Sequence, residues 1–352
     1  MQILEGNLIA FDIDSLENLN LSESEYITKY MGDKYRPMSF LLPITFAYMT
    51  IFVTGIIGNI LTCIIMRKLS TTQTPTNYYL FNLAVSDLLL LILGVPNELM
   101  IFWEKYPWTL GLSICKLRAY VSETSSYVSV LMIVTFSLER YLAICHPFQL
   151  YAKSGMKRPV RFIVSAWLLA LVCALPFGIY TTVNYLEYPA QSGRPSEKSA
   201  FCAMLLHSIP VFPLYELSCF MFFLVPMVYI AVVYVKISLR IRRNNLKHNN
   251  VNSSVHGDRH AQTRKAVRLL SAVVIAFFMC WAPFHIQRIL YVYQIPLLEE
   301  IDEWLFPIAG LLYYFSCTVN PILYCIMSKK YRTEFKRILG CSEIPINMET
   351  HL

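Results

Sequence analysis

Charged side chains stand at a few positions inside or beside the long apolar stretches of this sequence. A charge in hydrocarbon is costly even on lenient insertion scales, so each needs an ionic partner, a bound cation or a ligand. Glu139 and Arg140 are adjacent, which places an acid and a base together at the end of one stretch. The other candidates are Asp87, Glu98, Glu123 and Arg288. The chemistry that these residue types favour is ion pairing and cation binding.

These charges belong to seven apolar segments, each long enough to cross a membrane. Of the 352 residues, 56% are hydrophobic and 15% are charged, whereas soluble domains carry about 25% charged residues. A helix of roughly 20 apolar residues spans about 30 Å of hydrocarbon. The sequence therefore predicts an all-α membrane protein, a seven-transmembrane helix bundle. The spans centre on residues 41–66, 78–103, 119–145, 160–180, 211–235, 267–291 and 304–327.

Lysine and arginine predict the orientation of the bundle, because short loops rich in them stay in the cytoplasm. They gather after spans one, three, five and seven, while the alternate loops are acidic or mixed. We expect an extracellular tail at 1–39, the transmembrane domain at 40–328, and a cytoplasmic amphipathic helix with a tail at 329–352. The first span is expected to act as its own signal anchor. The net charge of +7 then reflects topology, and nucleic acid is not an expected partner.

Two of the ten cysteines differ from the rest in their expected surroundings. Cys115 and Cys202 face the oxidising outer side, so we expect a disulfide between them. Seven others fall in or at the inner ends of the spans, where they act as small packing residues. Cys341 ends an amphipathic basic segment, 328–341, that is predicted to lie on membrane lipid, which makes Cys341 a palmitoylation candidate. Asn20 in the outer tail begins a glycosylation sequon.

Motifs of catalysis and transport are missing from the sequence. It contains no zinc-protease HExxH, no phosphate-binding loop, no GxSxG elbow and no inverted repeat. We therefore predict that the protein is not an enzyme and needs no cofactor.

Each apolar span carries a polar, aromatic or proline landmark. In chain order these are Asn59, Asp87, Glu139-Arg140-Tyr141, Trp167, Pro226 with Tyr234, "FFMCWAPFH" at 277–285 and "NPILY" at 320–324. The set resembles the rhodopsin-like, class A family of G-protein-coupled receptors over about residues 40–340. Seven landmarks in the right order make this a far more specific signal than any one of them.

A narrower resemblance is carried by "YLFNLAVSDLLLLILGVPNELMIFWEKYPW", "SLERYLAICHPF" and "FFMCWAPFHIQRILYVY". These stretches are similar to neuromedin U receptors of vertebrates and to pyrokinin and CAPA peptide receptors of arthropods. The resemblance implies a plasma-membrane receptor for a short peptide ending in Pro-Arg-X-amide. Its cytoplasmic partners would be a heterotrimeric G protein of the Gq type, acting through calcium, and arrestin.

Two acids and a base mark the expected ligand site. Glu98 lies near the outer end of span two, and Glu123 follows Cys115 by eight residues, about 12 Å below the rim. Either each carboxylate reaches interfacial water, or the two share the arginine guanidinium of an amidated peptide. Arg288 would pair with one of the acids or meet a peptide carbonyl. The expected walls are Phe284, His285, Phe306 and Tyr314, although a lone histidine more often packs than binds.

The same resemblance implies a set of conformational switches. Arg140 would be balanced by Glu139 at rest and released toward the G protein on activation. The alternative is that Arg140 only anchors the helix at the lipid surface. The further expected switches are Asp87, Tyr141, Tyr234, Phe277, Trp281, Pro283, Asn320, Pro321 and Tyr324.

Asp87 has two interpretations. It forms a site for an allosteric sodium ion with Ser129, or it is a protonated carboxyl in a hydrogen-bonded helix contact. Ser316 and Cys317 stand where many relatives have Asn-Ser, which is a departure from the usual sodium site.

Two rival functions remain open. A class A receptor for another peptide, such as a ghrelin-like or neurotensin-like ligand, would not require the peptide amide. A transporter or channel is less favoured, and it would show substrate flux or current without a G protein.

Overall fold

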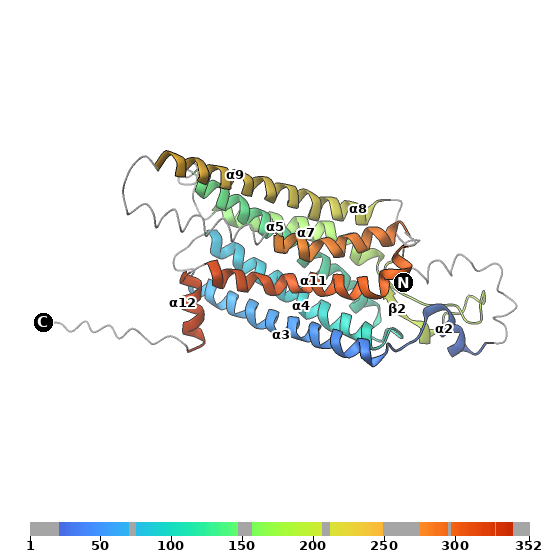
Figure 1. Ribbon diagram of the computed structural model, residues 1–352. Coiled ribbons are helices and arrows are strands. Elements are labelled where there is room, and N and C mark those ends of the chain that lie inside the picture. Colours follow the sequence, from blue (N-terminus) through green and yellow to red (C-terminus); the bar gives the residue numbers. More distant parts are fainter. Residues whose placement is uncertain are drawn as a thin grey trace.

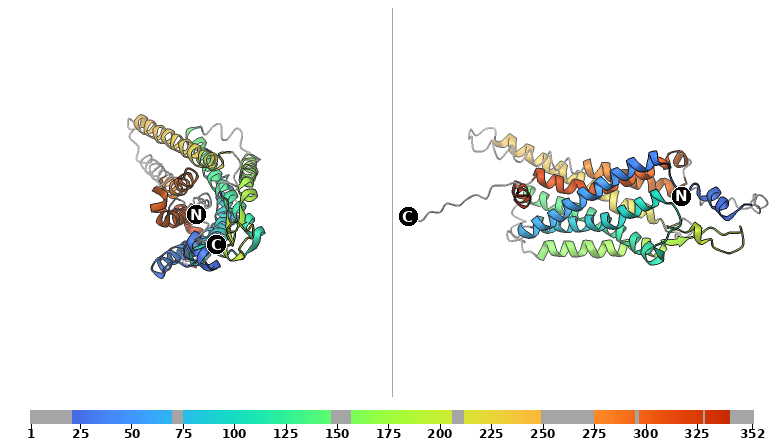
Figure 2. Two further views of the ribbon diagram at one scale, coloured as in Figure 1. Left: turned by 90° about the vertical axis from the view of Figure 1, so that its right-hand side faces the viewer. Right: turned by 90° about the horizontal axis from the view of Figure 1, so that it is seen from below.

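The computed structural model describes residues 21–69, 75–146, 157–205, 212–248, 275–294, 297–327 and 329–340. Within these ranges, seven helices are long and apolar enough to cross a membrane, which confirms the predicted bundle. They run side by side along a common direction (Figures 1 and 2).

The helix bounds follow the predicted spans closely. The first four spans are α3 (Met38–Leu69), α4 (Pro75–Trp103), α5 (Gly111–Cys145) and α7 (Lys157–Tyr180). The fifth consists of α8 (Leu214–Cys219), a wider π-helical turn η5 (Phe220–Leu224) and α9 (Val225–His248). The sixth is Ile275–Val292, and the seventh is α11 (Leu297–Met327). Helix α5 begins further out than expected, because its polar first turns rise above the apolar stretch.

Polar side chains tie neighbouring spans together inside the bundle. The Asn59 amide of α3 donates to the carbonyls of Gly55 in its own helix and Cys317 in α11, at 2.9 and 3.0 Å. The Trp167 indole of α7 donates to the Asn82 side chain of α4 at 3.0 Å. In an apolar medium such bonds satisfy groups that water cannot reach.

Large apolar side chains cover the outside of the bundle. Examples are Phe46 of α3, Val172 of α7 and Val235 of α9, which are exposed by 76%, 63% and 58%. Exposure of this kind on span after span is what a protein solvated by lipid tails requires.

A β-hairpin and a short helix form the outer end. Strands β1 (Thr182–Asn184) and β2 (Phe201–Ala203) pair antiparallel, with Val183 opposite Cys202. The expected disulfide between Cys115 and Cys202 is present and joins the hairpin to α5. Helix α2 (Glu23–Met31) lies beside the hairpin (Figure 1). Its sequence is short and polar, so nothing in the hydropathy pattern predicted it.

Helix α12 (Lys329–Ile338) crosses the end of the bundle that is predicted to face the cytoplasm, and it turns away from the direction of the spans (Figure 1). Tyr331 of α12 is buried, and its hydroxyl hydrogen-bonds to the Thr62 hydroxyl of α3 at 2.8 Å. Its ring also meets the edge of Tyr324, with centroids 5.9 Å apart. The predicted amphipathic helix therefore exists, and Tyr331, Phe335 and Ile338 pack it against the bundle.

Candidate functional site

An ion pair bridges the outer halves of the third and sixth spans. The Arg288 Nη1 donates to Glu123 Oε2 at 3.1 Å, and its Nη2 donates to Oε1. Both side chains are largely buried, at 17% and 8% exposure. This two-bond fork is the strongest geometry available to an arginine and a carboxylate. Of the two positions considered for Arg288, the structure shows the pairing with an acid.

Aromatic rings surround the guanidinium of Arg288. Its central carbon lies 4.2 Å from the ring centroid of Phe284, and 5.4 Å from those of both Phe177 and Tyr215. Contacts of this kind are worth most where water is excluded. Phe284 belongs to the same span as Arg288, while Phe177 and Tyr215 come from α7 and α8, so Arg288 contacts these two helices as well as pairing with α5.

Glu98 has a different environment from Glu123. One of its carboxylate oxygens is shielded from solvent and has no hydrogen-bond partner among the described residues. It interacts electrostatically with the hydroxyls of Tyr48 and Tyr314 and with Arg118 of α5. The Tyr314 hydroxyl packs against Gly94, one helical turn from Glu98, where any side chain would clash. A shielded carboxylate oxygen without a donor is an available acceptor for a ligand.

An aromatic layer lies beneath the ion pair. Tyr313 stacks on Phe284 with centroids 4.2 Å apart and meets the edge of Trp281 at 5.2 Å. Its hydroxyl also forms a short hydrogen bond with Ser126 of α5. Tyr313 therefore connects the seventh span to the third and to two levels of the sixth.

His285 is buried within this layer. Its ring stacks on Phe223 of η5 at 4.8 Å and on Trp281 at 6.3 Å. Neither ring nitrogen has a hydrogen-bond partner among the described residues. The predicted wall residue Phe306 lies higher in α11, edge-on to Phe102 at 6.1 Å.

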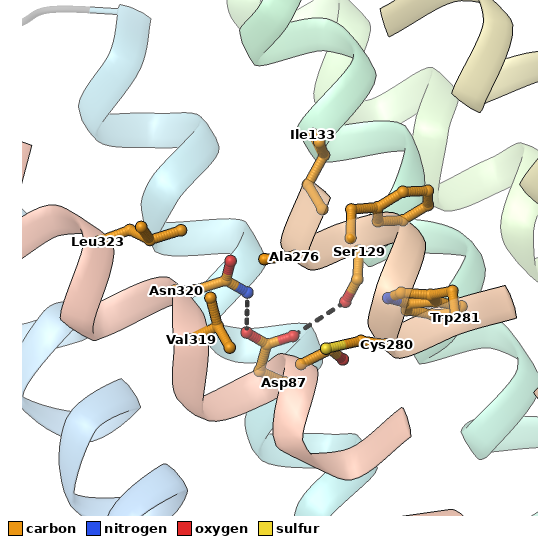
Figure 3. A pocket seen from close by; sticks show the side chains of 11 residues that line it. Asp87, Ser129, Ile133, Ala276, Cys280, Trp281, Val319, Asn320 and Leu323 are labelled. Carbon is orange, nitrogen blue, oxygen red and sulfur yellow. Dashed lines mark hydrogen bonds between the residues drawn. The ribbon is translucent and has the colours of Figure 1, made fainter. Parts of the chain in front are cut away.

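A small cavity around Asp87 occupies the middle of the bundle (Figure 3). Asn320 donates to Asp87 Oδ2 at 2.8 Å, and Ser129 donates to Oδ1 at 3.1 Å. The Ser129 hydroxyl also pairs with Ser86 at 2.9 Å. The lining also includes Trp281, Phe277 and Ser316. The structure thus brings together the predicted residues Asp87, Ser129, Asn320 and Trp281.

At the end predicted to face the cytoplasm, Glu139 forms an ion pair with Arg158 of α7, at 3.4 Å. The Arg140 guanidinium lies 4.8 Å from the ring centroid of Phe136 and interacts electrostatically with Glu139 and Tyr234. Ser137 and Tyr234 share a hydrogen bond of 3.2 Å between α5 and α9. The Tyr141 hydroxyl meets the His146 ring at 3.3 Å.

The remaining predicted positions divide into two groups. Pro283 lies within the sixth span and Pro321 within α11. Phe277 stacks on Trp281 with centroids 5.6 Å apart, and Tyr324 is buried beside Tyr331 of α12. The glycosylation and palmitoylation candidates, Asn20 and Cys341, lie outside the described residues.

Several residues of the site carried no recognisable signal in the sequence. Arg158 was visible only as one of the cytoplasmic basic residues, and its partner could not be chosen among them. Ser126 and Tyr313 resembled ordinary packing residues. Helical spacing offers one signal in retrospect, since Ser126 is one turn from Ser122 and Ser129 on the inward face of α5.

The comparison with protein families agrees with this arrangement. Residues 58–324 match the family described as 7 transmembrane receptor (rhodopsin family). The chain belongs to this family. It is therefore a multi-pass membrane protein of the G-protein-coupled receptor class, as the resemblance implied.

Individual relatives show which receptors of the family this chain resembles. The pyrokinin-1 receptor of Drosophila melanogaster is 35% identical, over 88% of this chain and 82% of the relative. Neuromedin-U receptor 2 of Mus musculus is 33% identical, over 94% of this chain and 82% of its own length. A neuromedin U receptor homologue of Caenorhabditis elegans is 36% identical, over 91% of this chain and 85% of the relative. The receptor thus resembles pyrokinin and neuromedin U receptors along most of its length.

Proposed function

We propose that this receptor binds an amidated neuropeptide ending in Pro-Arg-X-amide at its outer face and activates a Gq-type G protein at its inner face. It would act in the plasma membrane with its N-terminus outside and signal through calcium, with arrestin as a second cytoplasmic partner. The similarity to pyrokinin and neuromedin U receptors supports the ligand class. The basic cytoplasmic loops support the orientation.

The unsatisfied carboxylate oxygen of Glu98 is the observation that carries this proposal. A guanidinium offers donors on a planar fork and stays charged at any physiological pH. The arginine of the peptide would donate to Glu98 and gain from the surrounding tyrosines Tyr48 and Tyr314. A neutral donor could satisfy the oxygen but would add no charge, and an anionic group would be repelled.

Glu123 and Arg288 supply the second half of the proposed site. Without ligand, the pair holds the third and sixth spans together. A peptide guanidinium between Glu98 and Glu123 would share or replace the fork of Arg288, freeing Arg288 for the amidated end. Because only a ligand with differential contacts can shift the equilibrium, this exchange is the proposed link to activation.

Sodium is the proposed ion of the inner cavity. The Asp87 carboxylate and the Ser129 and Ser86 hydroxyls converge there, and oxygen groups of this kind suit a hard cation. A cation held by them would add positive charge next to a buried acid.

The test of the ligand class is intracellular calcium in cells that express the full chain. Peptides ending in Pro-Arg-Leu-amide, Pro-Arg-Val-amide and Pro-Arg-Asn-amide are compared with their free acids. We expect a potent response that needs the amide. Equal potency of the free acids would favour the ghrelin-like or neurotensin-like alternative, and silence with confirmed surface expression would reject the peptide class.

Glu98→Gln tests directly whether the unsatisfied carboxylate of Glu98 binds the peptide. The substitution keeps the shape but removes the charge, so we expect peptide potency to fall by about 30-fold or more, or about 2 kcal/mol. Adding Glu123→Gln should abolish the response while the receptor still reaches the surface. The matched control is Glu197→Gln, since Glu197 is an exposed acid of the hairpin loop. Unchanged potency of Glu98→Gln would refute the guanidinium site.

A further inference from the structure

We propose that residues 21–36, here called the outer strap, position the entrance of the ligand site by holding both outer loops in place. The strap contains α2 and the segment that leads from it to α3. The structural part of the proposal stands on the contacts of the strap alone. Its effect on peptide binding rests on the proposed function.

The first attachment is polar and joins α2 to the hairpin loop. Glu23 accepts a hydrogen bond from the Ser196 hydroxyl at 2.7 Å and pairs with the Lys198 ammonium at 2.5 Å. The Tyr188 hydroxyl donates to the Leu21 carbonyl at 2.8 Å. Two different stretches of the loop are thus tied to the start of α2.

The second attachment is apolar. Tyr26 and Tyr30 lie on the buried face of α2, with ring centroids 4.7 Å apart, and Tyr26 packs against Tyr188 at 5.5 Å. They form a closed cluster with Leu186 and Phe201 of the hairpin region. Tyr26 is fully buried, so α2 and the hairpin loop share a small hydrophobic core.

The local sequence explains why such a short helix forms. Ser22 and Glu25 make a reciprocal capping box, in which each side chain accepts from the backbone of the other. Gly32 ends the helix at a positive φ of 73°, where side-chain-bearing residues are strained. An isolated helix of this length is marginal in water, so packing on the hairpin must supply the rest.

The third attachment reaches the first outer loop. The Tyr106 hydroxyl donates to the Gly32 carbonyl at 2.8 Å, and the Lys105 amide donates to the Lys34 carbonyl at 3.1 Å. Lys34 and Glu104 add an ion pair of 2.7 Å. One continuous segment therefore holds two loops that are far apart in the sequence.

The loops in turn connect to the ligand site. The hairpin is joined to α5 by the Cys115–Cys202 disulfide, and Arg118 donates to the Cys202 sulfur at 3.8 Å. The Trp108 amide of the first outer loop donates to the Ala200 carbonyl at 2.7 Å. Glu123 lies on α5 about 12 Å from Cys115 along the helix, toward the middle of the bundle. Through these contacts, movement of the strap is transmitted to the entrance of the ligand site above Glu98 and Glu123.

Hydrogen exchange of the full-length receptor in lipid nanodiscs tests the strap without any ligand. We expect Glu23→Lys and Lys198→Glu each to speed exchange of the amides of Leu186 and Ser196 about fivefold, since a partly exposed pair with one extra hydrogen bond is worth about 1 kcal/mol. The double exchange Glu23→Lys with Lys198→Glu should restore most of the protection. Thr28→Lys, on the exposed face of α2, is the control for added positive charge. Unchanged exchange in both single variants would refute the strap.

Dissociation of a fluorescent Pro-Arg-Leu-amide peptide tests its effect on binding. We expect about threefold to tenfold faster release from the single variants and recovery in the double exchange. If the variants change hydrogen exchange of the hairpin but not the rate of peptide release, the strap holds the loops but does not position the ligand site. If no amidated peptide binds even the unaltered receptor, the proposed function fails, and the exchange result still decides the structural claim.

Discussion

The two ion pairs of α5 lie at opposite ends of the bundle and differ in what they join. Glu123 forms a two-bond fork with Arg288 of the sixth span, whereas Glu139 makes a single 3.4 Å contact with Arg158 of α7. The outer pair therefore links α5 to the sixth span, while the inner pair links α5 to α7. The outer pair acts as a structural clamp between two helices of the ligand site. The inner pair fixes an acid beside Arg140.

Breaking the outer clamp should have the largest effect. Arg288→Met leaves Glu123 buried without its partner, which costs about 3–5 kcal/mol. We expect a clear drop in thermal stability of the purified receptor and loss of peptide response. Arg288→Lys, which keeps the charge but not the fork, should lose less. Melting curves that match the unaltered receptor would contradict the clamp.

Breaking the inner pair should have a smaller and opposite result. Glu139→Gln removes the charge that holds Arg158, and we expect about threefold to tenfold higher basal signalling because the resting state loses about 1 kcal/mol. Arg158→Gln serves as the paired variant, and the two changes together should not add. Basal inositol phosphate formation at equal surface expression gives the measurement. Additive effects would show that the two side chains act independently.

Tyr313 sharpens the comparison because it lies between the two ends. Tyr313→Phe removes only the hydroxyl that bonds Ser126, so we expect about a threefold rise in basal signalling from the loss of one interhelical hydrogen bond. Ser126→Ala should give a similar change, and the double variant no more. Tyr120→Phe is the control, since its hydroxyl donates to the Leu171 carbonyl of α7 at 3.2 Å, another interhelical bond of α5. An equal rise in the control would remove the special role of Tyr313.

The pH dependence of the outer strap should be the smallest effect. Hydrogen bonds from Lys198 and then Ser196 lower the pKa of Glu23, against a weaker opposing effect of burial. The stabilisation that ionised Glu23 contributes is therefore fully present above the pKa of about 4.3 that a glutamate has in the unfolded chain. It is lost only as the pH falls through the lower pKa of Glu23 in the folded protein. Glu187 is a further acid near the Tyr26 cluster, and Glu25 caps the start of α2. We expect hairpin exchange, corrected for intrinsic rates, to be constant from pH 7 to about pH 5; loosening within that range would contradict this assignment.

Some features of the fold follow from local sequence, and others do not. The seven spans were predictable because hydrocarbon demands about 20 apolar residues in each. The Cys115–Cys202 disulfide was predictable once topology placed both on the outer side. Helix α2 was not, because its stability comes from Tyr26 packing on a loop that is distant in sequence.

The candidate site shows the same division. Sequence alone determined which side chains could carry charge inside the bundle, and it placed Glu98, Glu123 and Arg288 near the outer end and Glu139 and Arg140 at the inner end. Only the tertiary structure decided that Arg288 forks onto Glu123 and leaves an oxygen of Glu98 unsatisfied. The physical reason is that depth along a helix follows from residue number, whereas partner choice depends on the rotation and crossing of helices, which packing between distant segments sets.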